Sequence, residues 1–256
     1  MPPARPAPVA GPELIAHRGY PARYPENTLP GLAAALDAGA RWLEFDVQLT
    51  LDRVPVLLHD ATLQRTAGRA GDALALPAAA LARVAVGETA RLGPAHAGVT
   101  VPTLAEALAL LDRTPGVTAF VELKGESIAR HGVAACLDAL APQLEAARGA
   151  WVLIGFDADM LAAAGARGWR RGWVLDRAGA AARARAEALR PEWLFVDRRK
   201  LRADRDLPWP GPWQWAAYVA NSSRTALALG ARGFGYVETD DIGGLLDGRA
   251  HTANDA

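Results

Sequence analysis

The chain has 256 residues, and its 51% hydrophobic and 22% charged composition excludes a disordered or collagen-like protein. Its 28 basic and 28 acidic residues cancel, which argues against a nucleic-acid partner. The single cysteine, Cys136, excludes an internal disulfide and a thiolate zinc site. Every apolar stretch is too short for a membrane span or a secretory leader, so we expect a cytoplasmic protein.

Short β-prone runs alternate with stretches of helical period along the chain. Several of the runs are continuously apolar, as in strands buried on both faces. The predicted strands are residues 13–17, 42–47, 117–124, 151–156, 171–175, 193–197, 213–219 and 235–239. The predicted helices are residues 29–38, 103–112, 132–148, 158–166, 178–190 and 222–230. The link between the sixth and seventh strands shows no clear helix.

This alternation predicts parallel strands joined by helical crossovers. Eight such strands favour an α/β fold of the (β/α)8 TIM barrel type. A doubly wound open sheet is the alternative, but it would usually carry a glycine-rich phosphate loop after the first strand, which is missing. We expect a flexible tail over residues 1–11, one barrel domain over 12–248 and a frayed end over 249–256.

The segment after the second strand departs from this alternation. Residues 48–59 contain two β-like runs joined by a short polar turn, which predicts a hairpin. An irregular stretch follows up to Val101, so we expect a small insertion after strand two, at about residues 51–101. Long βα loops of a barrel lie on its C-terminal face, where barrel enzymes carry out their chemistry.

Acidic residues occur at the ends of two neighbouring predicted strands. Glu44 and Asp46 are two residues apart, so both side chains face the same way. Glu122 ends the next barrel strand and is expected beside them. Three carboxylates at one barrel mouth form an oxygen site suited to one divalent ion, Mg²⁺ or Ca²⁺. The alternative is that they are solvated strand-end charges paired with arginines.

Two histidines and two cations are predicted at the same mouth. His17 and His59 follow the first strand and the hairpin, and a pair of imidazoles can act as general acid and general base. Either one alone would more simply be a satisfied polar group of the core. Arg18 and Lys124 supply the positive charge that binds phosphate. Together these groups indicate phosphoryl chemistry.

The order of these motifs resembles the glycerophosphodiester phosphodiesterase family, in its bacterial cytoplasmic type. The motifs are Ala16-His17-Arg18-Gly19, Pro25-Glu26-Asn27-Thr28, Glu44-Phe45-Asp46, Leu58-His59-Asp60, Leu63-Gln64-Arg65-Thr66 and Glu122-Leu123-Lys124. Weaker landmarks extend the resemblance from about residue 14 to 246. Two positions depart from the family pattern: Tyr218 stands where tryptophan is common, and Gly155 replaces a small hydroxyl residue.

The resemblance implies a TIM barrel that hydrolyses glycerophosphodiesters to sn-glycerol 3-phosphate and an alcohol. It further implies that Glu44, Asp46 and Glu122 hold the metal, that His17 and His59 form the acid/base pair, and that Arg18 and Lys124 bind the phosphate. In the family mechanism, the glycerol 2-hydroxyl attacks phosphorus and water then opens a cyclic phosphate. The oligomeric state is left open.

Three alternatives stand beside this reading. A lysophospholipase D-type phosphodiesterase would use the same site but would need an apolar channel beside the mouth. A catalytically silent binding module would be expected to lack one of the seven site residues, and all seven are present. An unrelated carboxylate-metal barrel, such as an isomerase, leaves the two histidines without a role.

Overall fold

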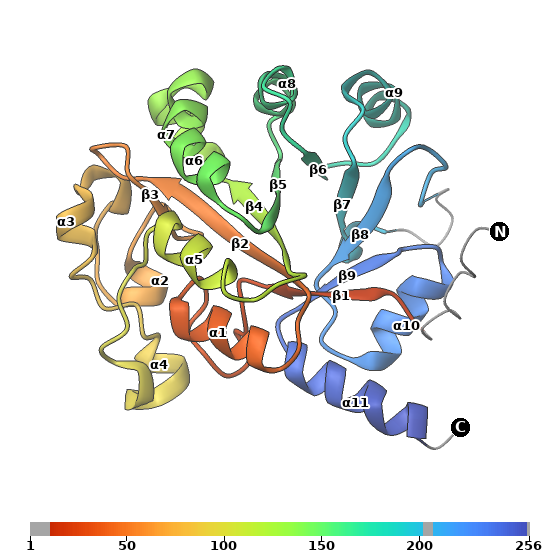
Figure 1. The fold of residues 1–256 in the computed structure, drawn as a ribbon, viewed down its shortest axis with the longest axis horizontal. Helices are drawn as coiled ribbons and strands as arrows, with labels where there is room; N and C mark the ends of the chain where they lie inside the picture. Colours follow the sequence, from red (N-terminus) through yellow and green to blue (C-terminus); the bar gives the residue numbers. More distant parts are fainter. Residues whose placement is uncertain (1–10, 202–206, 255–256) are drawn as a thin grey trace.

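Eight parallel strands close into a barrel in the computed structural model, which describes residues 11–201 and 207–254 (Figure 1). Strand β1 closes the ring because it pairs in parallel with both β9 and β2. The barrel strands are β1 (Glu13–His17), β2 (Trp42–Leu49), β4 (Thr118–Leu123), β5 (Ala150–Gly155), β6 (Arg171–Leu175), β7 (Trp193–Asp197), β8 (Gln214–Tyr218) and β9 (Tyr236–Thr239). The (β/α)8 architecture predicted from the sequence is confirmed.

Helices surround the barrel (Figure 1). They are α1 (Leu29–Asp37), α5 (Leu104–Leu111), α6 (Gly125–His131), α7 (Val133–Ala146), α8 (Ala158–Ala166), α9 (Ala180–Leu189), α10 (Ser223–Ala231) and α11 (Ile242–Asn254). Several begin where the sequence offers a cap: Asp157 and Ser222 accept backbone N–H groups, and Thr103 forms a capping box with Glu106.

The described chain differs from the sequence expectations at a few elements. Helices α6 and α11 were not predicted, and α11 continues into the segment that was expected to fray. Between β7 and β8 the described residues form only the 3-10 turn η3 (Arg198–Lys200). The expected tail over residues 1–10 and the last two residues, 255–256, lie outside the described residues.

The inside of the barrel is apolar at one end and polar at the other. Its N-terminal end is filled by side chains that include Ile15, Phe120, Trp193 and Phe195, with Trp42 packed against them. Trp42 stacks on Phe120 at a ring-centroid distance of 5.8 Å. The ionisable side chains lie at the opposite, C-terminal strand ends, so the aromatic layer forms the floor beneath the candidate site.

The insertion begins with the predicted hairpin and forms a small lobe beside the mouth. Strand β3 (Pro55–Leu57) pairs antiparallel with β2, which confirms the hairpin. The lobe then folds through α2 (Gln64–Ala67), η1 (Ala73–Ala75), α3 (Ala78–Leu81), α4 (Thr89–Leu92) and η2 (Gly93–His96). It has its own apolar cluster, in which Leu63, Leu81 and Val101 are buried. The lobe can therefore hold its shape while its polar residues face the barrel.

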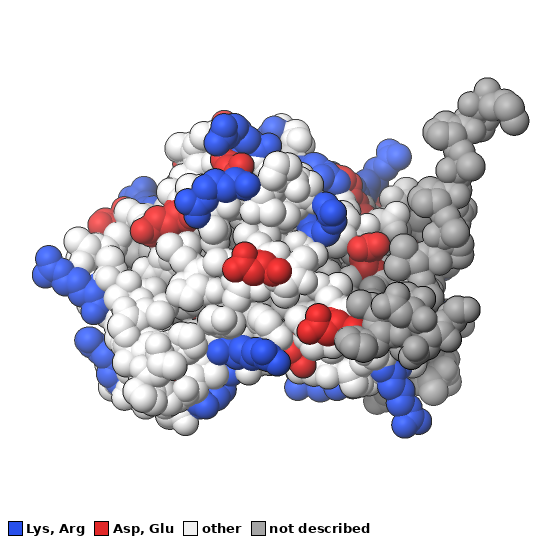
Figure 2. Space-filling model, turned by 60° about the horizontal axis from the view of Figure 1, so that its bottom comes forward, with Lys and Arg blue, Asp and Glu red and all other residues white. Residues whose placement is uncertain are grey.

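Figure 2 shows one face of the molecule, and on it basic and acidic side chains are interspersed without a broad patch of one sign. This distribution agrees with the zero net charge. Among the described residues, no helix is both long and apolar enough to cross a membrane.

Candidate active site

Three carboxylates meet at the C-terminal mouth of the barrel. Glu44 and Asp46 lie on β2, and the strand register places Asp46 directly beside Glu122 on β4. One oxygen from each of the three acids lies within 4.8 Å of the others. The sequence prediction that these three side chains converge is therefore matched by the geometry.

Burial and charge set these acids apart from ordinary carboxylates. Glu44 and Asp46 are only 2% and 1% exposed. Burial, together with the neighbouring charge of Asp46, raises the pKa of Glu44 well above its usual value and raises that of Glu122 as well. Burial also disfavours the charge on Asp46, but Arg18 and Lys124 outweigh it and hold its pKa below the usual range.

The acids offer what a divalent cation needs. Glu44 Oε2 accepts the Arg18 backbone N–H at 3.1 Å, whereas Glu44 Oε1 is buried without a hydrogen-bond partner. A buried, unpartnered oxygen is costly, and a cation among the three carboxylates would satisfy it. The donors are all oxygens, which suits a hard divalent ion rather than zinc. The residues present therefore fit a metal ion.

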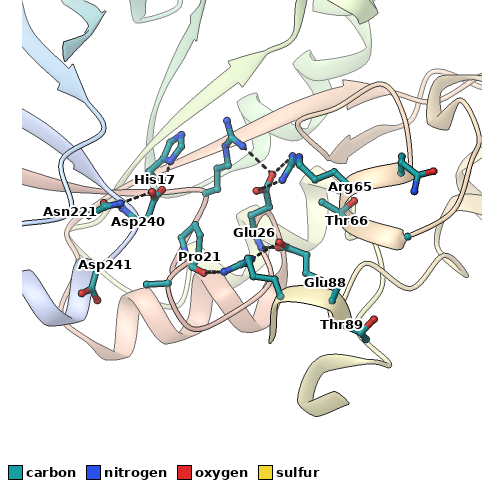
Figure 3. A pocket seen from close by; sticks show the side chains of 16 residues that line it. His17, Pro21, Glu26, Arg65, Thr66, Glu88, Thr89, Asn221, Asp240 and Asp241 are labelled. Atoms are coloured by element: carbon teal, nitrogen blue, oxygen red, sulfur yellow. Dashed lines mark hydrogen bonds and ion pairs between the residues drawn. The ribbon is translucent and has the colours of Figure 1, made fainter. Parts of the chain in front are cut away.

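His17 is oriented by Asp240, the residue that follows the last strand of the barrel. Its Nδ1 lies 2.7 Å from Asp240 Oδ1, and Asn221 donates to the other oxygen of Asp240 at 2.8 Å (Figure 3). Burial would lower the pKa of His17, but the bond to Asp240 outweighs it and the pKa is raised. The carboxylate can only accept, so Nδ1 carries the proton and Nε2 faces the mouth. Nε2 lies 3.9 Å from Glu44 Oε2.

His59 is held in the same way on the other side of the mouth. Its Nδ1 lies 2.6 Å from Asp60 Oδ1. Burial disfavours the charge on Asp60, but hydrogen bonds from Arg65 and His59 lower its pKa, so it stays an acceptor. Both imidazoles thus have a carboxylate on Nδ1 and present Nε2, the arrangement that suits a pair of proton-transfer groups.

The two predicted phosphate-binding cations contact the clustered carboxylates. Lys124 Nζ is 2.7 Å from Glu122 Oε1 and 3.2 Å from Asp46 Oδ1. Arg18 Nε is 3.0 Å from Asp46 Oδ2. Arg18 adopts a left-handed backbone with φ of 53°, and Gly19 follows with φ of 88°. A Cβ at Gly19 would lie 2.8 Å from the backbone of α1, so only glycine lets this turn pack there.

Two cavities meet at His17 and Arg18. One, of about 440 Å³, lies over the barrel mouth and is bordered by His17, Arg18, His59, Glu122 and Lys124. The rest of its wall is partly apolar, at Ile154, Phe156, Val174, Phe195 and Val219, and partly polar, at Asp197, Arg199, Lys200, Tyr218 and Glu238. The second, of about 810 Å³, lies between the barrel and the insertion (Figure 3). All seven predicted site residues are therefore gathered at the mouth.

Several residues of the mouth were not singled out by sequence reasoning. Asn27 Nδ2 donates to Asp46 Oδ2 at 2.8 Å, and Asn27 Oδ1 accepts the backbone N–H of Asp46 at 3.0 Å. Asp240 orients His17, and Glu238 lines the mouth cavity while being 3% exposed. Burial raises the pKa of Glu238 to about 7. A position at the end of β9 was the available signal for Glu238 and Asp240, whereas Asn27 lies in the loop before α1, within the motif Pro25-Glu26-Asn27-Thr28. Asp197 at the end of β7 is also buried and borders the cavity.

The structure is thus a (β/α)8 barrel whose mouth carries three clustered carboxylates and two imidazoles that are each oriented by an aspartate. A model of the Glycerophosphoryl diester phosphodiesterase family matches residues 17–152, more than half of the chain. The chain belongs to this family, and the resemblance noted from its motifs is confirmed.

Named relatives agree with this membership. Glycerophosphodiester phosphodiesterase 1 of Bos taurus is 34% identical over 113 residues, which cover 44% of this chain and 34% of that protein. A glycerophosphodiester phosphodiesterase of Bacillus altitudinis is 36% identical over 126 residues, covering 46% of this chain and 47% of that one. The chain thus spans less than half the length of these curated relatives.

Solved structures match over nearly the whole chain. A phosphodiesterase of Oleispira antarctica, in complex with the product sn-glycerol-3-phosphate, superposes with a TM-score of 0.80 and 27% identity, covering 96% of this chain and 98% of that one. The glycerophosphodiester phosphodiesterase of Thermotoga maritima gives a TM-score of 0.69 at 23% identity, over 92% and 97% of the two chains, and supports the fold.

Proposed function

We propose that this protein is a metal-dependent phosphodiesterase that hydrolyses glycerophosphodiesters to sn-glycerol 3-phosphate and an alcohol. The observation that carries the proposal is the mouth itself: two imidazoles, each with its Nδ1 on a carboxylate, face three acids grouped within 4.8 Å. The similar Oleispira antarctica structure holds sn-glycerol-3-phosphate, which supports this substrate class. The catalytic unit in the proposal is the single barrel domain expected over residues 12–248.

Glu44, Asp46 and Glu122 are proposed to hold one divalent ion, Mg²⁺ or Ca²⁺. When bound, the ion would supply positive charge that polarises phosphoryl oxygens. Arg18 and Lys124 are proposed to bind the phosphate, exchanging part of their contact with Asp46 for contact with the substrate. Their charge stabilises the negative charge that grows on the phosphoryl oxygens during reaction.

The histidines are proposed to move protons in two stages. One imidazole Nε2 takes the proton of the glycerol 2-hydroxyl as that oxygen attacks phosphorus, and the other protonates the departing alcohol oxygen. The product of this stage is a glycerol cyclic phosphate. In the second stage the roles reverse: one imidazole takes a proton from water, and the other returns a proton to the 2-oxygen as the ring opens. Both histidines end in their starting forms.

A coupled assay for sn-glycerol 3-phosphate over a panel of glycerophosphodiesters tests the proposal. We expect turnover with Mg²⁺ or Ca²⁺, loss of turnover with excess EDTA, and recovery when the metal is returned. Absence of turnover on every diester of the panel with either metal would refute the proposed reaction. Full activity in excess EDTA would refute the metal assignment.

A lysophospholipase D-type reaction is a second candidate because part of the wall of the mouth cavity is apolar. Phe156 on this wall is 46% exposed, and Ile154, Val174 and Phe195 extend the wall inward. An acyl chain would need such a surface. Choline release from lysophosphatidylcholine and from glycerophosphocholine, measured side by side, separates the two reactions. A higher kcat/KM on the lysolipid would favour the second.

A small-molecule substrate without a nucleic-acid partner belongs to the same proposal, and the zero net charge favours it. The cytoplasmic location expected from the sequence is also part of the proposal.

A further inference from the structure

One guanidinium of the insertion, that of Arg65, holds two carboxylates next to the candidate active site. Figure 3 shows its contact with Glu26. Arg65 of α2 donates from Nη1 and Nη2 to the two oxygens of Glu26, at 2.6 and 2.8 Å. Its Nε donates to Asp60 Oδ2 at 2.7 Å. All three nitrogens are used, and two carboxylates from different segments are fixed relative to each other. A lysine ammonium lacks this planar fork.

Each of these carboxylates continues to a residue of the site. Asp60 uses its other oxygen, Oδ1, to hold His59 Nδ1 at 2.6 Å. Glu26 Oε1 also accepts from Arg18 Nη1 at 3.1 Å. Arg65 is therefore one carboxylate away from a candidate acid/base imidazole and one carboxylate away from a candidate phosphate-binding guanidinium.

The charges indicate what this arrangement does. The Glu26 side chain is only 9% exposed, so its negative charge acts strongly on its neighbours. Arg65 neutralises that charge, which leaves more of the positive charge of Arg18 available to a phosphate. On the other side, Arg65 stops the Asp60 carboxylate from rotating away from His59.

We propose that Arg65 is a positioning residue for the phosphodiesterase reaction, acting on His59 through Asp60 and on Arg18 through Glu26. The inference rests on the proposed function and gives the insertion a part in it. Loss of Arg65 would then lower kcat through the His59 side and raise KM through the Arg18 side.

The chain offers a matched control for the docking of the insertion. Arg130 Nη2 lies 2.9 Å from Asp72 Oδ2 and joins α6 to the insertion at another place. Its side chain is 34% exposed, close to the 43% of Arg65. Within the described part of the chain, neither Arg130 nor Asp72 bonds any of the seven site residues. Arg130→Ala thus removes an insertion contact without touching the site.

Kinetics on glycerophosphocholine provide the first test. We expect Arg65→Ala to lower kcat/KM roughly 10–100-fold, with both kcat and KM changed, and Arg65→Lys to recover little of it. Methylguanidinium can enter the adjoining cavity of about 810 Å³ and should restore turnover to Arg65→Ala. Arg130→Ala should stay near wild type with or without it. The proposal would be overturned if Arg65→Ala kept near-normal kinetics or if Arg65→Lys recovered full activity. It would also be overturned if methylguanidinium did not restore turnover to Arg65→Ala, or if Arg130→Ala lost as much activity as Arg65→Ala.

Nitrogen NMR of the His59 ring provides a test that does not depend on turnover. With the ring signals identified through His59→Ala, the wild type and Arg130→Ala should show one tautomer, protonated at Nδ1. Arg65→Ala should show a mixture of tautomers. Unchanged His59 signals in Arg65→Ala would overturn the proposal even in an active enzyme. A wild type inactive on all glycerophosphodiesters would instead overturn the proposed function, and the spectra would still decide whether Arg65 positions His59.

Discussion

Each candidate catalytic histidine has one nitrogen fixed by an aspartate and the other directed at the mouth, so both should be needed for turnover. We expect His17→Ala and His59→Ala each to lower kcat on glycerophosphocholine by roughly 10² or more, because each removes one of two proton-transfer groups. The control is His96→Ala, since His96 lies in η2 of the insertion and its ring packs at a tilt against Tyr24 instead. Near-normal rates in both variants would remove the acid/base assignment.

Glu44 should contribute to metal binding more than to folding. Glu44→Gln keeps the shape but removes one of the charges at the cation site, and we expect metal affinity to fall at least about tenfold. The melting temperature without metal should not drop, because Glu44 is buried against the like charge of Asp46. Calorimetric titration measures the affinity, with Glu13→Gln at the exposed start of β1 as control. Unchanged affinity in Glu44→Gln would exclude it as a ligand.

The spacing of Glu44 and Asp46 within one strand predicted that their side chains point the same way, because residues i and i+2 of a strand share a face whatever the rest of the chain does. The convergence of Glu44 and Asp46 followed from that rule alone. Their orienting partners did not follow from any local rule. Asp240 lies 223 residues from His17, and Arg65 reaches Glu26 across 39 residues, so only the closed fold brings them together.

At the scale of elements, the capping box of α5 makes a measurable contribution to stability. Thr103 Oγ1 accepts the Glu106 N–H at 3.2 Å, and Glu106 Oε2 accepts the Thr103 N–H at 2.8 Å. We expect Thr103→Ala to lower the free energy of unfolding by about 1 kcal/mol, whereas Thr103→Ser should retain most of it. Urea denaturation compares the two variants. Equal free energies of unfolding for Thr103→Ala and Thr103→Ser would show that the hydroxyl cap does not stabilise the protein.

Elements with strong local signals were predicted well, and those shaped by the surrounding fold were not. Strands β1, β6 and β7 have the predicted bounds because their apolar runs stop at polar residues. Helix α6 has only seven residues and ends at Gly132, so its period was too short to read. Helix α11 contains three glycines, which weaken any helical signal. The short turns of the insertion depend on their own apolar cluster instead.

For the whole molecule, metal binding should raise thermal stability. An ion that binds only the folded state at about 100 times its Kd adds about 2.7 kcal/mol, which corresponds to roughly 5–10 °C in a chain of this size. Relief of repulsion among the three acids acts in the same direction. Differential scanning calorimetry in EDTA and in excess Ca²⁺ or Mg²⁺ measures the shift, which should be much smaller in Glu44→Gln. Equal shifts in wild type and variant would place the ion elsewhere.

The hydrogen bond between His17 and Asp240 joins the first strand of the barrel to the residue that follows the last one. A ribosome makes His17 early and Asp240 near the end of synthesis. A nascent or truncated chain that stops before β9 would already contain all three acids and His59, yet it would leave the His17 imidazole free to rotate. Competence for catalysis would therefore be acquired in a single late step, when the ring of strands is sealed.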